Sequence, residues 1–163
     1  MSEVAWTPKQ YELFALMANP ENRHIMAYGG ARSGKTFALV YAIVDRAHKH
    51  PGSRHLIARL RFNHAKASIW LDTLPKVLQS YQLKHTTNET DHYIKFTNGS
   101  EIWVDGLDDK DRVDKILGRE YCTIFFNEIS QMPYDTVTTV RTRLSQKVGD
   151  CIPKGYYDLN PLG

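Results

Sequence analysis

Apolar residues recur along this chain in two patterns, short continuous runs and longer stretches with a helical repeat. The helical repeat is clearest where Phe37, Val40, Tyr41 and Val44 fall on one face. We expect helices at 6–17, 34–49, 63–81, 108–117 and 133–144, and strands at 23–28, 54–60, 121–126 and 156–159. Strands that alternate with helices predict an α/β domain with a mainly parallel central sheet flanked by helices.

Turn and capping residues support these boundaries. Thr7 can cap the first helix through its hydroxyl, and Pro8 suits the first turn. Pro75 lies inside the longest helical pattern and is expected to kink that helix. The Asn98-Gly99 pair predicts a β-hairpin. The expected register pairs Ile94 with Ile102, Tyr93 with Trp103, and Lys95 with Glu101.

Composition narrows the possible functions. The 163 residues, 42% of them hydrophobic, suit one globular domain over 1–163. With 21 Lys and Arg against 18 Asp and Glu, the net charge of +3 permits a nucleic-acid partner without requiring one. No apolar run approaches the roughly 20 residues of a membrane helix, so we expect no membrane contact. We expect Cys122 and Cys151 to be reduced thiols, and the 7 His residues lack the spacing of a zinc site.

One motif carries specific chemistry. Residues 29–36 match the phosphate-loop pattern G-x-x-x-x-G-K-[ST] with the sequence Gly29-Gly30-Ala31-Arg32-Ser33-Gly34-Lys35-Thr36. An apolar strand precedes the motif and an amphipathic helix follows it, as a phosphate loop requires. Gly29 and Gly34 allow backbone N–H groups to approach a phosphate closely. Lys35 can bind the β- and γ-phosphates, and the Thr36 hydroxyl can bind Mg²⁺.

A second segment supplies a base that can activate water. The apolar strand before position 127 ends in Asn127 and Glu128. Glu128 is placed to polarise water for attack on the γ-phosphate. Asn127 occupies a position where an aspartate is normal; its oxygen can order a metal-bound water but brings no charge. We therefore expect that Asn127→Asp tightens Mg²⁺-dependent nucleotide binding.

The order of the segments resembles the large terminase subunit of tailed bacteriophages. The matching segments are Thr7-Pro8-Lys9-Gln10, the phosphate loop, Asn98-Gly99-Ser100-Glu101-Ile102, Gly106-Leu107-Asp108, Leu117-Gly118-Arg119 and Asn127-Glu128. This resemblance spans nearly the whole chain. It implies a P-loop NTPase fold of the ASCE (RecA-like) class. It also implies an ATPase that uses ATP and Mg²⁺ to drive double-stranded DNA into the capsid.

The resemblance also implies roles for individual residues. Three residues match the segment that recognises adenine, namely Trp6, Thr7 and Gln10. Arg32 matches a phosphate-loop arginine that senses the γ-phosphate. Arg119 matches an arginine finger that reaches a neighbouring subunit, and Asn160 lies where the coupling motif of the family reports the phosphate state. The rival candidates for the finger are Arg112, Arg141 and Arg143.

Partners and location follow from the same resemblance. It implies double-stranded viral DNA, the portal protein, the small terminase subunit, and a homo-oligomeric ring on the capsid in the cytoplasm of the infected bacterial host. An isolated chain is expected to be monomeric. Large terminases continue into a lid segment and a nuclease domain. Because the sequence ends three residues after Asn160, we expect a partial ATPase domain, weak or inactive alone and without nuclease activity.

Contacts with DNA are less clearly indicated. Two basic clusters could touch DNA phosphates, and solvated helix faces explain them equally well. They consist of Arg59, Arg61, His64 and Lys66, and of Lys110, Arg112 and Lys115.

Two other functions stay open from the sequence alone. Another P-loop NTPase, of helicase or repair type, would share the loop and the glutamate, but 131–155 offers no further nucleic-acid motif. A nucleotide-binding module with little hydrolysis is favoured by the uncharged Asn127.

Overall fold

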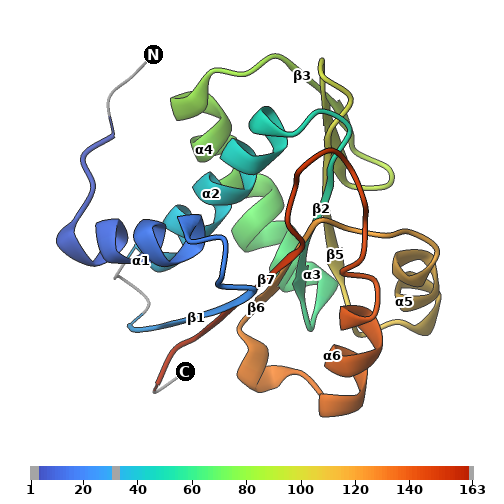
Figure 1. Ribbon diagram of the computed structural model, residues 1–163. Coiled ribbons are helices and arrows are strands. Elements are labelled where there is room, and N and C mark those ends of the chain that lie inside the picture. The colour runs from blue at the N-terminus through green and yellow to red at the C-terminus, as the bar shows by residue number, and fades with distance from the viewer. Residues whose placement is uncertain (1–3, 31–33, 162–163) are drawn as a thin grey trace.

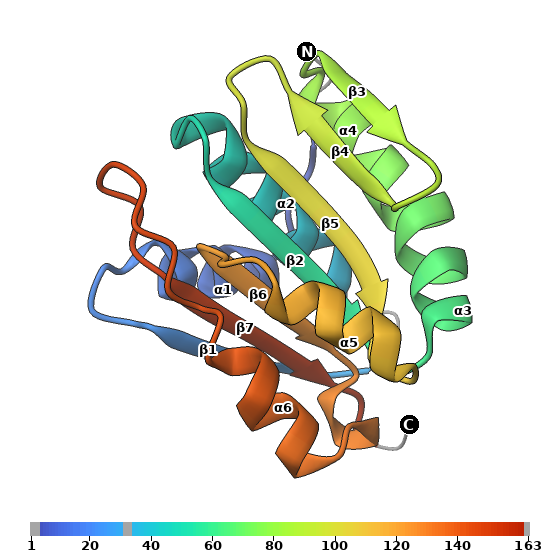
Figure 2. The same cartoon turned by 90° about the vertical axis from the view of Figure 1, so that its right-hand side faces the viewer.

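A mainly parallel sheet forms the centre of the molecule. The computed structural model describes residues 4–30 and 34–161. Within these ranges the strands are β1 (His24–Tyr28), β2 (Arg54–Arg59), β3 (His85–Asn88), β4 (Tyr93–Phe96), β5 (Glu101–Gly106), β6 (Thr123–Asn127) and β7 (Lys154–Leu159). They lie in the order β1-β7-β6-β2-β5-β4-β3 (Figure 2). The first five in that order are parallel, and β4 and β3 extend one edge in antiparallel fashion. The predicted sheet is confirmed.

Helices cover both faces of this sheet. In the described ranges they are α1 (Pro8–Ala18), α2 (Lys35–Lys49), α3 (Phe62–Ala65), η1 (Lys66–Thr73), α4 (Leu74–Tyr81), α5 (Lys110–Leu117), η2 (Ile129–Gln131) and α6 (Tyr134–Arg141). Figure 1 shows α1, α2 and α4 on one side of the sheet, and α5 and α6 on the other. Alternate residues of β2 enter the two cores, because side chains alternate along a strand. Ile57 packs on the α2 side, and Leu56 and Ala58 pack on the α5 side.

Local signals place the element ends close to the predicted residues. Thr7 is the N-cap of α1: its Oγ1 accepts a hydrogen bond from the Gln10 N–H at 3.2 Å, and Gln10 Oε1 accepts one from the Thr7 N–H at 2.9 Å. The β4–β5 hairpin has the expected register, with Ile94 opposite Ile102. Gly99 adopts a φ of 86°, which a glycine tolerates in this turn. The predicted cap and hairpin are therefore confirmed.

The longest helical segment contains an irregular middle. A π-helix, η1, separates α3 from α4, and Pro75 lies in the first turn of α4. Proline lacks an N–H and crowds the carbonyl four residues before it, so the wider turn directly precedes the residue that disfavours a regular α-helix. The disturbance expected at Pro75 thus takes the form of a π-helix. Across 4–30 and 34–161, no helix is both long and apolar enough to cross a bilayer.

Strand β3 was not predicted from the sequence. Its residues are polar and mostly exposed, and it pairs only with β4 at the edge of the sheet. An exposed edge strand has no buried face, so it lacks the alternating apolar pattern by which strands are recognised.

The expectation of two reduced thiols is wrong, because Cys122 and Cys151 form a disulfide. Cys122 directly precedes β6 and Cys151 lies shortly before β7, and these two strands pair in parallel. The neighbouring strand starts bring together two cysteines that lie 29 residues apart in the sequence. Arg46 of α2 also joins the two segments, donating to the carbonyl of Cys122 at 3.1 Å and to that of Ile152.

Candidate functional site

Polar side chains gather where the parallel strands end. In Figure 2 the arrowheads of β7, β6, β2 and β5 point to one edge of the sheet, near the C-terminus of the chain. Helix α2 begins directly after the phosphate loop that follows β1. We call the polar residues at this edge the carboxyl-end cluster: Lys35, Thr36, Asn127, Glu128, Asp158 and Asn160. Ligands of open α/β sheets bind at this edge, so the cluster is the candidate site.

The described part of the phosphate loop is held against α1. Gly34 is the N-cap of α2 with a φ of 75°, and an added Cβ would lie 2.6 Å from Nε2 of Gln10. The same Nε2 donates a hydrogen bond to the Gly34 carbonyl at 3.0 Å. A glycine is therefore required at this position for its backbone conformation and for the close approach of Gln10. Ala31, Arg32 and Ser33 lie outside the described residues.

A chain of hydrogen bonds connects the phosphate-loop lysine to the expected base. Lys35 is buried at the start of α2, and its Nζ donates to Oδ1 of Asn160. The Nδ2 of Asn160 in turn donates to Oε1 of Glu128 at 2.7 Å. The structure thus brings together three residues that the sequence analysis selected separately. It places Asn160 between Lys35 and Glu128.

Asp158 on β7 is the centre of the cluster. Its carboxylate accepts hydrogen bonds from the Thr36 hydroxyl at 3.2 Å, from Asn127 Nδ2 at 3.0 and 3.1 Å, and from the Glu128 N–H at 2.7 Å. The residue is 0% exposed. Burial raises the pKa of Asp158, although the Glu128 N–H, Lys35 and Asn127 act in the opposite direction. The hydrogen bonds of the fully buried Asp158 carboxylate thus connect β7 with β6 and α2.

The backbone at Glu128 is also unusual. Its φ is 56° and its ψ is 55°, a left-handed conformation that is uncommon for a residue other than glycine. Such a conformation costs on the order of 1–3 kcal/mol and is found disproportionately at functional sites. Here it accompanies the hydrogen bond from the Glu128 N–H to Asp158, which contributes to holding the turn.

The donor set at this edge suits a magnesium ion bound together with phosphates. The hydroxyl of Thr36 and the carboxylate of Asp158 are hard oxygen donors, which Mg²⁺ prefers. Among the described residues, no group of three or more His, Cys, Asp or Glu side chains could hold a metal ion without other ligands. The residues therefore fit an ion that takes its remaining ligands from a nucleotide and water.

The expected adenine segment is divided between two places. Gln10 lines a cavity of about 280 Å³ beside the loop, together with Gly29, Gly30 and Lys35. The Trp6 ring instead packs edge-on against Phe14 and Tyr41, with centroids 4.7 and 4.8 Å apart, and lines a cavity of about 570 Å³ between α1 and α2. Of these two cavities, only the smaller one includes described phosphate-loop residues. Trp6 and Gln10 thus do not line one pocket.

The sequence profile of the phage terminase large subunit family matches residues 21–161. This chain belongs to that family. No curated protein matches it.

Solved terminase structures share the fold. The large terminase of a thermophilic bacteriophage superposes with a TM-score of 0.83 at 20% identity, covering 97% of this chain and 40% of that protein. Its complex with ATP-gamma-S gives 0.77 at 19% identity, covering 96% and 38%. The HK97 bacteriophage large terminase gives 0.74 at 11% identity, covering 96% and 33%. The Phi-28 gp11 DNA packaging motor gives 0.56 at 14% identity, covering 94% and 49%. The chain therefore spans less than half the length of these terminase relatives.

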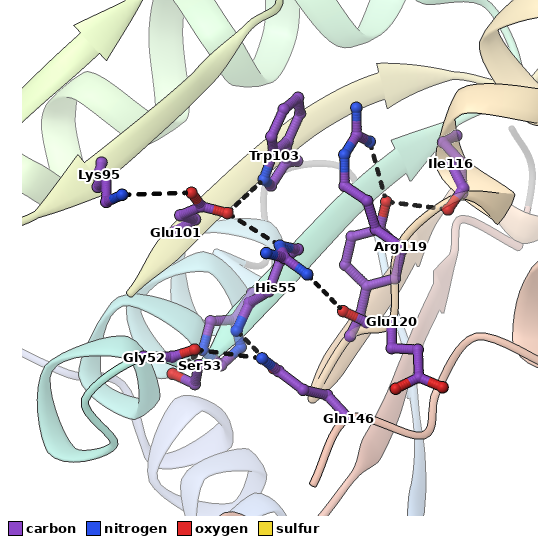
Figure 3. Close-up of polar contacts among 12 residues, drawn as sticks. Gly52, Ser53, His55, Lys95, Glu101, Trp103, Ile116, Arg119, Glu120 and Gln146 are labelled. Carbon is purple, nitrogen blue, oxygen red and sulfur yellow. Dashed lines mark hydrogen bonds and ion pairs between the residues drawn. The ribbon is translucent and has the colours of Figure 1, made fainter. Parts of the chain in front are cut away.

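The arginine proposed as a terminase finger lies at the other end of the strands. The Arg119 guanidinium stacks on the Trp103 ring at 3.6 Å and donates to the Tyr121 hydroxyl at 3.3 Å (Figure 3). Figure 3 shows Trp103 beside Glu101. Glu101 forms an ion pair with Arg54, with the Arg54 Nε and the Glu101 Oε1 2.9 Å apart. We call this group the amino-end cluster: Arg54, His55, Glu101, Trp103, Arg119 and Tyr121. Strand β6 separates it from the carboxyl-end cluster by roughly 15 Å.

The rival arginines occupy different surroundings. Arg112 on α5 forms an ion pair with Asp105 at 3.2 Å and lies over the Phe62 ring at 3.6 Å. The carbonyl of Arg143 accepts the Tyr121 N–H at 2.7 Å. Arg141 is the last residue of α6 and is partly exposed. No contact of these three with the carboxyl-end cluster is found among the described residues.

The two basic clusters lie close together in space. The Phe62 N–H donates to Asp108 at 3.3 Å, and the Phe62 ring contacts Arg112, so the start of α3 adjoins the start of α5. Arg61, His64, Lys66, Lys110 and Lys115 are exposed in this region. Arg59 differs, because it lies opposite Asn127 in the β2–β6 register and its Nη1 donates to Ser68 at 3.0 Å. It belongs to the edge of the site rather than to an open surface.

Asp158 and the position of Arg59 at the site were not predicted from the sequence. A signal for Asp158 was present, since an aspartate near the end of an apolar strand is rarely buried without partners. Arg59 carried no such signal. Its place next to Asn127 follows from the pairing of β2 with β6, which lie far apart in the sequence.

Proposed function

We propose that this terminase chain is the ATP-binding and ATP-hydrolysing motor domain that powers translocation of double-stranded DNA into a viral capsid. The observation that carries the proposal is the hydrogen-bonded path from Lys35 through Asn160 to Glu128, next to a phosphate loop. The family assignment and the fold shared with a DNA packaging motor support it. Portal protein, small terminase subunit and a ring of subunits are the proposed partners.

Each residue of the path has a distinct task in the proposed reaction. Lys35 binds the β- and γ-phosphate oxygens, and its three N–H donors let it retain Asn160 while doing so. Asn160 fixes Oε1 of Glu128 and so orients the carboxylate. Glu128 then accepts a proton from the water that attacks the γ-phosphate, the bond between the γ-phosphorus and the bridging oxygen breaks, and ADP and phosphate leave. A change at the phosphates reaches the base through Asn160, which is the coupling role expected from the family.

We also propose that the reaction depends on magnesium. Thr36 would hold the ion directly and Asn127 would act from the adjacent strand, and the ion when bound would neutralise charge on the β- and γ-phosphate oxygens. Gln10 is held against Gly34, and we propose that its amide contacts adenine from this position. Arg32 is proposed to contact the γ-phosphate, and Arg119 to serve the site of a neighbouring subunit.

Two variants test the proposed function in the full-length motor. Glu128→Gln keeps the shape of the side chain and removes its basicity, so nucleotide binding is retained while hydrolysis falls by about 10²–10⁴-fold. Lys35→Ala removes a charge-assisted contact of about 1.5–3 kcal/mol, so ATP affinity falls roughly 10- to 100-fold. Calorimetry gives the affinities and phosphate release gives the rates. Glu120→Gln, an exposed glutamate outside the site, is the control.

The results also separate the alternatives. Unchanged ATP affinity in Lys35→Ala would contradict the phosphate site. An equal loss of binding and turnover in Glu128→Gln would give Glu128 a structural or metal-binding role. Tight ATP binding without turnover in the assembled motor would instead favour a nucleotide-binding module.

A further inference from the structure

We propose that the negative charge which holds the metal ion of the bound nucleotide comes from Asp158 on β7, and that Asn127 on β6 positions this carboxylate. The proposal rests on the proposed ATPase function and assigns the acid of that site. It treats the uncharged residue at 127 and the buried acid at 158 as one feature. The carboxylate that is normal at position 127, at the end of β6, is replaced by that of Asp158 on the adjacent strand β7.

The register places the two residues side by side. Strands β6 and β7 pair in parallel from Thr123 opposite Lys154 to Phe126 opposite Tyr157, so the next pair is Asn127 and Asp158. Paired residues of parallel strands point to the same face, and adjacent strands lie about 4.8 Å apart. Moving the acid from one strand to the next therefore displaces it by about one strand spacing.

The contacts of Asp158 are those of a carboxylate next to a metal-binding hydroxyl. Its Oδ2 lies 3.2 Å from the Thr36 hydroxyl, the group that the phosphate-loop motif assigns to the metal. Its Oδ1 accepts the Glu128 N–H at 2.7 Å, which fixes the carboxylate relative to the base. The side chain is wholly buried, so it has no role in solubility or surface charge. Stability of the fold does not by itself require a buried acid between three donors at this edge.

Asn127 fits this arrangement better than an aspartate would. Its Nδ2 lies 3.0 and 3.1 Å from the two oxygens of Asp158, so the amide donates to the carboxylate. An aspartate at 127 would replace that donor with a second negative charge at the same distance. From the sequence alone we expected Asn127→Asp to tighten Mg²⁺-dependent nucleotide binding. The structure reverses this expectation. The single change should weaken the site, and only a change at both positions should restore it.

The experiment moves the charge between the strands. Affinity for ATP-gamma-S is measured by calorimetry with and without Mg²⁺ in the wild type, in Asp158→Asn, and in the double variant Asn127→Asp with Asp158→Asn. Asp105→Asn is the matched control, because Asp105 is also a buried aspartate near the end of a parallel strand but is paired with Arg112. Circular dichroism and thermal unfolding report whether each variant is folded.

The expected result is a loss of the magnesium effect and not of nucleotide binding. In Asp158→Asn the gain in affinity on adding Mg²⁺ falls by about 10- to 100-fold, while metal-free binding is retained. The double variant recovers most of the gain, and Asp105→Asn keeps all of it. If Asp158→Asn does not fold, the double variant decides the question. It keeps one acid and one amide at the two positions, so it is expected to fold.

Other outcomes overturn the proposal. A wild-type magnesium effect in Asp158→Asn would contradict it, and so would a folded double variant that fails to recover the effect. Failure of the double variant to fold would contradict the equivalence of the two positions. These results can be distinguished from those expected if the proposed function is wrong. In that case wild-type protein would not bind ATP-gamma-S, or its binding would not depend on Lys35.

Discussion

The same parallel strands carry a polar cluster at each end, and the two clusters are built differently. At the carboxyl end, three donors converge on the fully buried carboxylate of Asp158, and Glu128 adopts a left-handed backbone conformation. At the amino end, Glu101 is partly exposed and bound by Arg54 and Trp103, while Arg119 stacks on the Trp103 ring. We propose that the first cluster serves a ligand, whereas the polar groups of the second contact one another.

The difference suggests a division of tasks along one set of strands. A buried, donor-rich carboxylate with local backbone strain is typical of a site whose geometry serves chemistry. A half-exposed ion pair stabilises a fold only weakly. The amino-end cluster should therefore affect stability and leave nucleotide binding unchanged, except where Arg119 serves a neighbouring subunit.

The strongest test of this division concerns Arg119. If it acts on the site of a neighbouring subunit, Arg119→Ala in the assembled full-length motor lowers hydrolysis by about 10³–10⁵-fold, because an arginine finger neutralises charge on the γ-phosphate. ATP affinity of the isolated chain should not change, since Arg119 lies at the amino end of the strands. Mixed rings of Arg119→Ala and Glu128→Gln subunits should recover hydrolysis, because some interfaces pair an intact Glu128 with an intact Arg119.

The mixed rings also give the result that would contradict the role of Arg119 at a neighbouring site. No recovery over either variant alone, in rings shown to contain both, would exclude Arg119 as the trans-acting residue. The candidates would then be Arg112, Arg141 and Arg143. Loss of ATP affinity in the isolated Arg119→Ala chain would break the comparison itself.

The sequence predicted more of the carboxyl-end cluster than of the amino-end cluster. The phosphate loop and Glu128 were selected because each follows a strand in a pattern with a known physical purpose, and Asn160 because the resemblance to large terminases implies a coupling role for it. In the structure Lys35 contacts Asn160, and Asn160 contacts Glu128. Asp158 was missed because 31 residues separate it from Asn127, and only the position of β7 beside β6 makes them neighbours.

Strand order is the general reason for these misses. Sequence patterns indicate where strands begin and end but not which strands pair across the sheet. The pairing of β6 with β7 also explains the Cys122–Cys151 disulfide, and the pairing of β2 with β6 explains the place of Arg59. The hairpin register was predictable because its two strands are consecutive and joined by Asn98-Gly99. Edge strand β3 was missed because no face of it is buried.

A second prediction tests the structural role of the amino-end cluster through pH. His55 is fully buried between Ser53 Oγ and Thr123 Oγ1, each 2.7 Å from a ring nitrogen. Burial, and secondarily the nearby Arg46 and His50, hold the pKa of His55 well below its usual value of 6.5. Below pH 6.5 the unfolded chain therefore binds a proton that the folded chain does not. Stability is lost as pH falls, by up to about 1.4 kcal/mol per pH unit from this residue.

The measurement is urea unfolding of the chain between pH 7.5 and 5.5. His55→Gln should show a smaller loss of stability over this range, whereas His85→Gln, at an exposed position on β3, should show the wild-type loss. His24 and His92 also have lowered pKa values, chiefly from burial, so part of the pH dependence remains in both variants. An unchanged slope in His55→Gln would mean that His55 binds the proton equally in the folded and the unfolded chain.

The smallest predicted effect is that of Glu101→Gln. This variant tests whether the ion pair between Arg54 and Glu101 serves stability or function. Burial raises the pKa of Glu101, but hydrogen bonds from Arg54 and Trp103 outweigh it and hold the pKa below the usual 4.5. The folded state therefore favours the charged form, so this stability is present above pH 4.5 and is lost as pH falls through the lower folded value. Glu101→Gln should lower the free energy of unfolding at pH 7 by about 0.2–1 kcal/mol, because the partners are partly exposed. The difference from wild type should shrink below pH 4.5 and in high salt, and calorimetry should give the wild-type affinity for ATP-gamma-S. A loss of nucleotide affinity comparable to that of Lys35→Ala would show that the amino-end cluster is coupled to the nucleotide site, and the proposed division between the two ends of the strands would fail.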